Sequence, residues 1–197
     1  MLKFFIKVVT RVFSTNLFAK LLFDVDCSKS NVKYQIGFST ILMKKALKKY
    51  VKNNDKVLDI GTGSIAIHSI WLKKKLNVDV VATEINGNYI ENAKKVMKHN
   101  KVKFKIIKND LFKGLEKNFD WVIFNPPFRD REDIGSYELV ERFLKEAPKN
   151  LKLMIVVNAA YVNQKKIGNI IKSSNYGIND VITAFLSPSK VYIIRRD

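Results

Sequence analysis

The stretch KVLDIGTGS, residues 56–64, joins a short apolar strand to a turn that contains two glycines. Residues 56–60 are predicted to form a buried strand, because apolar side chains dominate them. Gly61 and Gly63 follow at once, and glycines between a strand and a helix let a ligand approach the backbone. The start of the following helix favours polar or negative ligand groups. This stretch therefore predicts an α/β unit with a ligand site at the end of its strand.

Segments with strand and helix patterns alternate along the rest of the chain. The predicted strands cover residues 56–60, 78–84, 102–110, 120–124, 151–158, 181–186 and 190–195. Helices are predicted around residues 41–47, 64–75, 87–99, 136–147 and 162–174, after a polar loop at 24–34. Such alternation predicts one α/β domain with a mostly parallel, seven-stranded sheet and helices on both faces. Only Ser187, Pro188 and Ser189 separate the last two strands from each other, so these strands are expected to form an antiparallel hairpin.

The first 33 residues differ from the rest. Lys3, Lys7 and Arg11 recur at helical spacing, and an apolar stripe runs between them. We expect residues 1–33 to be a basic helical extension packed on the core, and residues 34–197 to form the main domain. The basic stripe either stays in water or faces RNA, with a membrane surface as a third option. The charges interrupt the apolar run, so neither a signal peptide nor an anchor is predicted.

The amino-acid composition of the chain indicates which kinds of binding partner to expect. The chain has 197 residues, with 36 Lys and Arg against 18 Asp and Glu, a net charge of +18. This excess favours a polyanionic partner, nucleic acid first, over a merely lysine-rich composition. Cys27 is the only cysteine, so no intramolecular disulfide can form and a cytoplasmic location is expected. With one Cys and two His in the sequence, no metal site is predicted. No apolar run reaches membrane-spanning length without a charge.

Polar residues stand at four predicted strand ends, where ligands bind in open α/β sheets. The strand ends carry Asp59, Glu84, the Asn109-Asp110 pair, and the turn Asn125-Pro126-Pro127-Phe128. Each residue has a plain structural alternative, because Asp59 and Asp110 can cap turns and Glu84 can cap the next helix. Their occurrence at successive strand ends predicts one shared ligand site.

A nicotinamide-binding protein is the first alternative, since it also combines a strand, a glycine turn and a later acidic residue. Asp59 argues against it, because its charge would repel a pyrophosphate. S-adenosylmethionine fits better. Its amino acid end suits the glycine turn near Asp59, its ribose suits Glu84, and its adenine amine suits Asp110.

The segments VLDIGTGS, VVATEI, KNDLF and VIFNPPF, in this order, resemble the class I S-adenosylmethionine-dependent methyltransferases, which have a Rossmann-like domain. The resemblance covers roughly residues 34–195. Residues 34–43, YQIGFSTILM, are similar to the segment that closes over the cofactor and include Gly37, Phe38 and Thr40. Many relatives have a third glycine where this chain has Ile65. The resemblance implies cofactor contacts at Thr40, Asp59, Gly61, Gly63, Glu84, Ile85, Asp110, Leu111 and Asn125.

The Asn-Pro-Pro-Phe turn narrows the resemblance to enzymes that methylate planar amino groups. The Asn125 side-chain oxygen and the Pro126 carbonyl can accept hydrogen bonds from the target amine and aim its lone pair. Pro126 and Pro127 hold these acceptors rigidly, and Phe128 can stack on a flat substrate. No general base is needed, because the methylated nitrogen loses its proton readily. His68 lies in an apolar helical stretch and is expected to be structural, and His99 ends a predicted helix.

The acceptor is expected to be an RNA base. Phe128 and the charge favour RNA, ribosomal RNA above all, with adenine N6 ahead of guanine N2. ATEINGNYIENAKK resembles RNA adenine methyltransferases, whereas ELVERFLKEAPKNLK is closer to ribosomal RNA guanine and protein glutamine methyltransferases. Arg129 and Arg131 either grip phosphates or lie in a solvated loop. A protein glutamine methyltransferase acting on a release factor and a non-catalytic RNA-binding scaffold are the alternatives. An activating protein subunit is a possible partner.

Overall fold

The computed structural model describes residues 15–116, 118–127, 134–148, 151–158, 162–185, 187 and 189–196. The predicted basic stripe at Lys3, Lys7 and Arg11 lies outside these ranges, as do Phe128, Arg129 and Arg131. Within the ranges, no helix is both long enough and apolar enough to cross a membrane.

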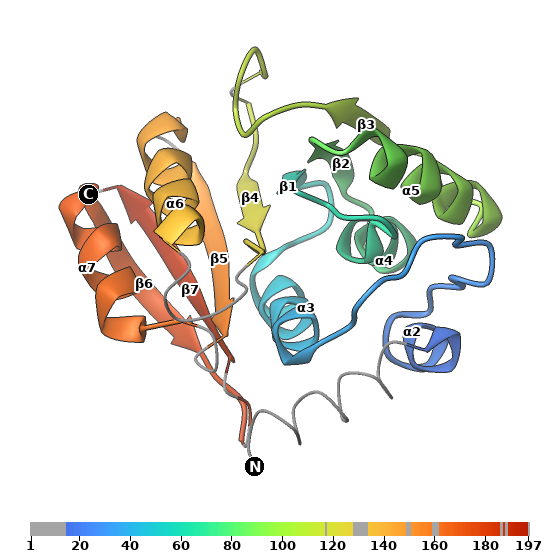
Figure 1. Cartoon of the computed structure of the whole chain (residues 1–197), viewed down its shortest axis with the longest axis horizontal. Coiled ribbons are helices and arrows are strands. Elements are labelled where there is room, and N and C mark those ends of the chain that lie inside the picture. The colour runs from blue at the N-terminus through green and yellow to red at the C-terminus, as the bar shows by residue number, and fades with distance from the viewer. Residues whose placement is uncertain are drawn as a thin grey trace.

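The elements alternate along the chain as the sequence predicts (Figure 1). The helices are α2 (Asn16–Phe23), α3 (Phe38–Tyr50), α4 (Ile67–Lys75), α5 (Gly87–His99), α6 (Ile134–Glu146) and α7 (Gln164–Ser173). The strands are β1 (Lys56–Ile60), β2 (Asp79–Glu84), β3 (Lys105–Lys108), β4 (Trp121–Phe124), β5 (Lys152–Asn158), β6 (Tyr176–Ile182) and β7 (Ser189–Arg196).

The strands form one seven-stranded sheet in the order β3-β2-β1-β4-β5-β7-β6. All pairs from β3 to β5 are parallel, whereas β7 runs antiparallel to both β5 and β6. The predicted mostly parallel sheet with a C-terminal antiparallel hairpin is confirmed. The strand order reverses direction between β1 and β4, and ligands bind at such switch points in open α/β sheets.

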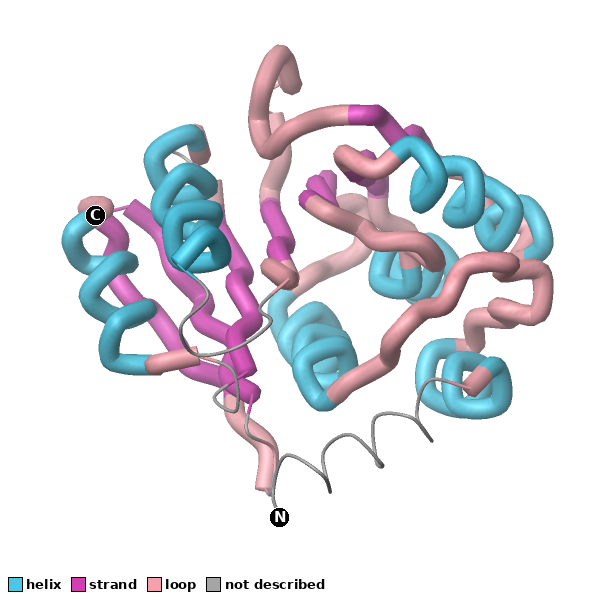
Figure 2. The backbone as a smooth tube through the Cα atoms, in the orientation of Figure 1, coloured by secondary structure: helices cyan, strands magenta, loops and turns pink. Residues whose placement is uncertain are grey.

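Helices cover both faces of this sheet (Figure 2). Successive residues of a strand point to opposite faces. Val57 accordingly packs in a core with residues of α2, α3 and α4, and Leu58 packs in a second core with residues of α6 and α7. On the second face, the ring of Phe124 stacks on Phe143 of α6, with centroids 4.5 Å apart and an interplanar angle of 17°. This contact supports the end of β4, where Asn125 begins the proline turn.

The largest differences from the predicted ranges fall on three elements. The predicted strand 102–110 is shorter, and the predicted helix 64–75 begins only at Ile67, because Ala66 takes a left-handed conformation with φ 43°. The sixth strand spans Tyr176–Ile182 rather than residues 181–186, so the hairpin connection is longer than Ser187–Ser189. Gly177 and Asp180 disfavour strand, but their pairing with β7 overrides this preference, whereas Asn179 lies at a shift in the register.

The described part of the predicted extension is tied to the body of the domain. Ala19 and Phe23 of α2 are fully buried. The Asp26 carboxylate accepts a hydrogen bond from Asn16 Nδ2 at 3.1 Å, and its other oxygen lies 3.2 Å from His99 Nε2. The Asn100 side chain bonds the Asp26 backbone through both its oxygen and its nitrogen. A domain boundary between residues 33 and 34 stays a prediction.

Candidate active site

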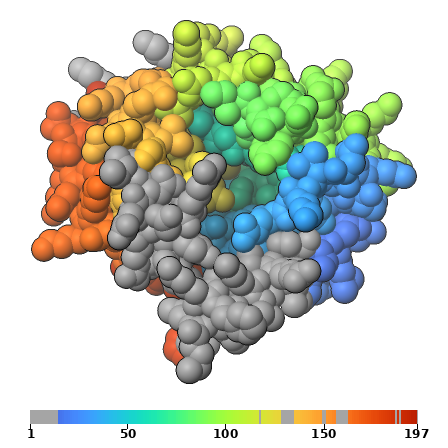
Figure 3. Space-filling view, viewed as in Figure 1, coloured from blue at the N-terminus to red at the C-terminus, as the bar shows by residue number. Residues whose placement is uncertain are grey.

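A cavity of about 1410 Å³ lies at the carboxyl ends of the parallel strands. Figure 3 shows the molecule hollowed there, with atoms of the β1–α4 region at the floor of the hollow. The nine predicted cofactor residues all line it: Thr40, Asp59, Gly61, Gly63, Glu84, Ile85, Asp110, Leu111 and Asn125. The structure therefore brings together side chains that the sequence places at separate strand ends.

The turn after β1 needs its two glycines. Gly61 has φ 66° and Gly63 has φ 72°, both in the left-handed region that favours glycine. A Cβ on Gly61 would meet only the Phe124 ring, at 4.0 Å, so the space beside this backbone is open toward the cavity. The Thr62 amide donates to the Thr83 carbonyl at 2.9 Å and fixes the turn against β2.

Asp59 is held rigidly at the floor of the cavity. It is 5% exposed, and its Oδ2 accepts hydrogen bonds from Thr62 Oγ1 at 2.7 Å and Ser69 Oγ at 2.6 Å. Burial raises the pKa of this carboxyl above its ordinary value, against the opposing influence of His68. The hydroxyl bonds fix one oxygen and orient the carboxylate.

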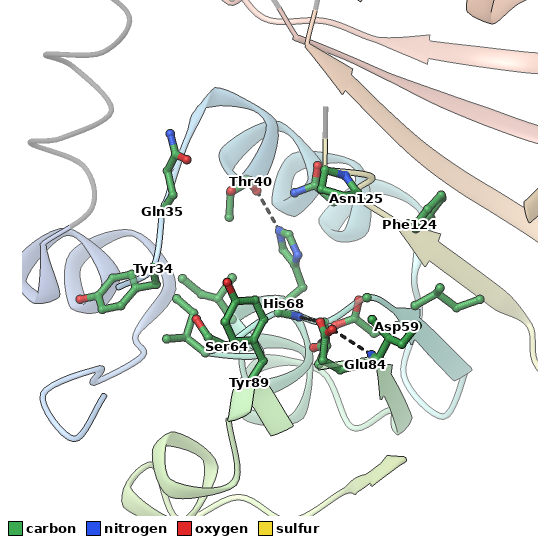
Figure 4. A pocket seen from close by; sticks show the side chains of 18 of the residues that line it. Tyr34, Gln35, Thr40, Asp59, Ser64, His68, Glu84, Tyr89, Phe124 and Asn125 are labelled. Carbon is green, nitrogen blue, oxygen red and sulfur yellow. Dashed lines mark hydrogen bonds between the residues drawn. The ribbon is translucent and has the colours of Figure 1, made fainter. Parts of the chain in front are cut away.

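Glu84 accepts hydrogen bonds from backbone amides of two segments, the turn after β1 and the residues that follow β2 (Figure 4). Its Oε2 accepts from the Gly63 amide at 3.0 Å, and its Oε1 accepts from the Ile85 and Asn86 amides at 2.8 and 3.0 Å. The N-cap of α5 is Asn86, whose side chain accepts from the Asn88 and Tyr89 amides, and Glu84 binds the Asn86 amide just before the helix. Carboxylate oxygens have several lone-pair sites, so Glu84 can also accept from a ligand.

Asp110 forms an ion pair that the sequence did not indicate. Arg142 of α6 places Nη2 2.8 Å from Asp110 Oδ2 and Nε 3.3 Å from Glu146 Oε1. Both Asp110 and Arg142 line the cavity, and both are about half exposed. Next to them, Leu111 takes a left-handed conformation with φ 50°, and its carbonyl accepts from Asn109 Nδ2 at 2.9 Å. Strained residues of this kind persist where the surrounding structure fixes them, often at functional sites.

The proline turn begins at the cavity. Asn125 is half-buried, Pro126 is buried, and Pro127 is exposed and lines the wall with Asn125. Ser136 Oγ donates to the Pro127 carbonyl at 3.1 Å and thereby ties the turn to the start of α6. The predicted stacking residue Phe128 lies outside the described residues.

His68 belongs to the cavity, which the sequence did not predict. It is 7% exposed, lines the cavity, and places Nε2 3.0 Å from the Thr40 carbonyl oxygen (Figure 4). Burial lowers the pKa of its imidazole, although the nearby Asp59 opposes the shift. One feature of the sequence could have indicated this position: His68 lies in the first turn of the helix that follows the glycine turn.

A wall of the cavity comes from residues 30–35, which include the first two residues of the segment expected to close over the cofactor. Asn92 of α5 fixes this wall. Its Oδ1 accepts from the Asn31 amide at 3.0 Å, and its Nδ2 donates to Ser30 Oγ at 2.9 Å and to the Ser64 carbonyl at 2.6 Å. Three residues of the segment 34–43 line the cavity, namely Tyr34, Gln35 and Thr40. Gly37 is the N-cap of α3, and its amide donates a hydrogen bond to Thr40 Oγ1.

The lining fits S-adenosylmethionine chemically. Asp59, Glu84 and Asp110 present three carboxylates, which suit a cationic ligand that carries an ammonium group, ribose hydroxyls and an adenine amine. The open space beside Gly61 gives such a ligand access to the backbone. Among the described residues, no group of three or more His, Cys, Asp or Glu is placed to hold a metal ion.

The fold and this cavity define a class I S-adenosylmethionine-dependent methyltransferase, as the sequence predicts. The chain belongs to the methyltransferase small domain family, whose model matches residues 30–177.

Two of the similar relatives have names that point to different acceptors. A Haemophilus influenzae ribosomal RNA small subunit methyltransferase C is 35% identical over 112 residues, which are 55% of this chain and 34% of that protein. The chain thus spans about a third of the length of this relative. A Methanocaldococcus jannaschii protein, provisionally a protein N5-glutamine methyltransferase, is 31% identical over 163 residues, 74% of this chain and 81% of that protein.

Solved structures share the fold. A methyltransferase from Pyrococcus furiosus superposes with a TM-score of 0.73 at 20% identity, covering 93% of this chain and 94% of that one. At this identity the likeness shows a common fold.

Proposed function

We propose that this protein transfers a methyl group from S-adenosylmethionine to an exocyclic amine of a base in RNA, ribosomal RNA first, with adenine N6 favoured over guanine N2. One observation carries the proposal: Asn125 lines the same cavity as Asp59, Glu84 and Asp110. β1 and β4 are neighbours in the sheet, with Asp59 paired to Ile123. A cofactor held by the carboxylates and an amine held by Asn125 would therefore meet within one cavity.

The cofactor residues have distinct proposed roles. Asp59 is placed to orient the amino acid end of the ligand, because its carboxylate is fixed beside the glycine turn. Glu84 and Asp110 are placed to accept from the ribose hydroxyls and the adenine amine. When bound, the cofactor supplies an activated methyl group on a sulfonium. Thr40, Ile85 and Leu111 complete the wall of the cavity.

Asn125 would bind and aim the acceptor. An exocyclic amine is a poor nucleophile, because its lone pair is delocalised into the ring. The Asn125 side-chain oxygen and the Pro126 carbonyl can each accept one N–H bond, which directs the lone pair and stabilises the positive charge that develops on nitrogen. After transfer, the nitrogen loses its proton to water, so no side chain must act as a base. Phe128 remains the proposed stacking residue.

The net charge and one of the relatives support an RNA acceptor. The net charge of +18 favours a polyanion, and the Haemophilus relative is named for ribosomal RNA. Arg129 and Arg131 are proposed phosphate contacts beside the target base. A cytoplasmic location and an activating protein subunit belong to the same proposal.

A protein glutamine acceptor is the second candidate. The Methanocaldococcus relative supports it, because this chain covers 81% of that protein. A glutamine side chain is also a planar amide, and the Asn125 turn would hold it in the same way.

A methyl-transfer assay separates these candidates. The protein is incubated with radiolabelled S-adenosylmethionine and with total RNA or total protein from cells that lack the gene. Label in RNA, followed by digestion to nucleosides, identifies the methylated base and supports the proposal. Label confined to a protein of release-factor size moves the acceptor to glutamine. No label in either, with the cofactor still bound, points to a missing subunit or to a scaffold.

A further inference from the structure

Phe185 is an aromatic side chain that the structure holds almost entirely in water. It is 94% exposed, in the turn between β6 and β7. Two hydrogen bonds fix the turn: Lys45 Nζ donates to the Thr183 carbonyl at 3.1 Å, and the Ser187 amide donates to the Ala184 carbonyl at 3.1 Å. Ala184 also packs against the first core. The ring is therefore presented on a defined support.

This turn lies at the edge of the sheet where the candidate active site lies. Ser189, the first residue of β7, pairs with Asn158, the last residue of β5, and β5 runs parallel to β4. The turn therefore lies at the same end of the sheet as the carboxyl end of β4, which Asn125 follows (Figure 1). β4 and β7 are separated by β5 alone, which corresponds to roughly 10 Å across the sheet. β5 also continues from Ile155, the partner of Phe124, to Asn158, so the turn begins roughly 10 Å further along the strand direction. One extended ligand can reach both places.

The surroundings of the turn are basic. Lys45 of α3 is exposed, and Lys190 at the start of β7 is half-buried. Lys45 contacts the turn directly. Proteins that bind single-stranded nucleic acid combine basic side chains for the backbone with aromatic rings on which bases stack. Protein–protein interfaces, in contrast, are depleted of lysine. Charge complementarity therefore favours RNA as the ligand of this turn.

We propose that Phe185 stacks on an unpaired base of the substrate RNA, a few nucleotides from the base that enters the cavity. The lysines beside it would hold the intervening phosphates. The proposal rests on the RNA methyltransferase function proposed above and extends it. It adds a second contact that would favour single-stranded or looped RNA over a continuous duplex.

A tryptophan at this position reports stacking directly. The two native tryptophans, Trp71 and Trp121, are only 4% and 6% exposed, so the indole of a Phe185→Trp variant would give a distinct, solvent-exposed fluorescence. We expect a short single-stranded RNA to quench it saturably. Asn53→Trp is the matched control, because Asn53 is exposed in the turn before β1, at the opposite end of the sheet. Its fluorescence should stay unchanged.

Kinetics provide the second measurement. Phe185→Ala should raise KM for RNA about tenfold, because it removes one stacked base, and leave the Kd for S-adenosylmethionine unchanged. Phe185→Tyr should restore the wild-type KM. If wild type labels RNA but Phe185→Trp is not quenched and Phe185→Ala keeps its KM, the stacking role alone is wrong. If wild type labels only protein and RNA leaves the indole unquenched, the proposed function and the stacking role both fail.

Discussion

The His68 Nε2 atom lies 3.0 Å from the Thr40 carbonyl oxygen, in a buried contact between the first turns of α4 and α3. α4 follows the glycine turn, and α3 follows the segment expected to close over the cofactor. His68 therefore joins two walls of the cavity that are 28 residues apart in sequence. The neutral imidazole must carry its proton on Nε2 to donate to this carbonyl.

Replacing His68 with Phe should weaken cofactor binding. The aromatic ring is kept, but the Thr40 carbonyl loses its buried donor, which costs about 1–3 kcal/mol. We expect the Kd for S-adenosylmethionine, measured by calorimetry, to rise about tenfold, with kcat at saturating cofactor little changed. His68→Gln, which retains an N–H donor, should recover part of the affinity. An unchanged Kd in His68→Phe would contradict a positioning role.

The same histidine should make stability depend on pH. Burial lowers the pKa of folded His68 below its ordinary value of 6.5. As the pH falls through about 6.5, the unfolded imidazole binds a proton that the folded one excludes, so the free energy of unfolding decreases by up to about 1.4 kcal/mol per pH unit. The contribution of neutral His68 to the free energy of unfolding is complete above about pH 6.5. It is lost progressively as the pH falls toward the lowered pKa of His68 in the folded protein.

Urea unfolding at several pH values between about 7.5 and 5.5 tests this expectation. Wild type should lose more stability than His68→Phe over that interval. Asp59 acts with the opposite sign, because burial raises its pKa. His68 opposes that shift, so its removal should raise the Asp59 pKa further and widen the expected difference between the two proteins. Parallel curves for the two proteins would show that His68 does not titrate in this way.

Asn125→Ala should separate binding from turnover. Loss of the side-chain oxygen removes a proposed acceptor for the target amine, and removal of one such group in other active sites lowers kcat about 10²–10³-fold. The Kd for S-adenosylmethionine should stay within about twofold of wild type, because the carboxylates remain. Asn125→Asp, which keeps an acceptor oxygen, is the conservative control. Wild-type turnover by Asn125→Ala would overturn the role proposed for this residue.

Arg142→Gln should have a small effect. Its ion pair with Asp110 is about half exposed on both sides, and exposed pairs contribute roughly 0–1 kcal/mol. We therefore expect the Kd for S-adenosylmethionine to change by no more than about fivefold. Asp110→Ala should weaken binding further, since it removes the carboxylate itself. A much larger effect of Arg142→Gln than of Asp110→Ala would mean that the guanidinium contacts the ligand directly.

The sequence predicted the parts of the site that leave a local pattern. β1, β2 and β4 are apolar runs that end in polar residues, so Asp59, Glu84 and Asn125 could be placed at one edge of the sheet. The predicted range of β6 was wrong, because Gly177 and Asp180 have a low preference for strand. The pairing of β6 with β7 stabilises the strand despite these residues.

The missed features are contacts between distant residues. Arg142 meets Asp110 across 32 residues, and Asn92 meets Asn31 across 61. Such pairs leave no periodic signal in the sequence. They follow from the packing of whole helices against the sheet, which only the structure provides.

The position of Asn92 has a consequence for the order of folding. One side chain, 2% exposed, joins the wall at residues 30–31 to the glycine turn at Ser64. Contacts of such long sequence separation form late, after the closure entropy of the intervening loops has been overcome. The cavity should thus be completed in the last steps of folding. Gain of ligand affinity in a refolding experiment would then lag behind formation of the sheet, and bound cofactor would stabilise the final, wall-docked state by mass action.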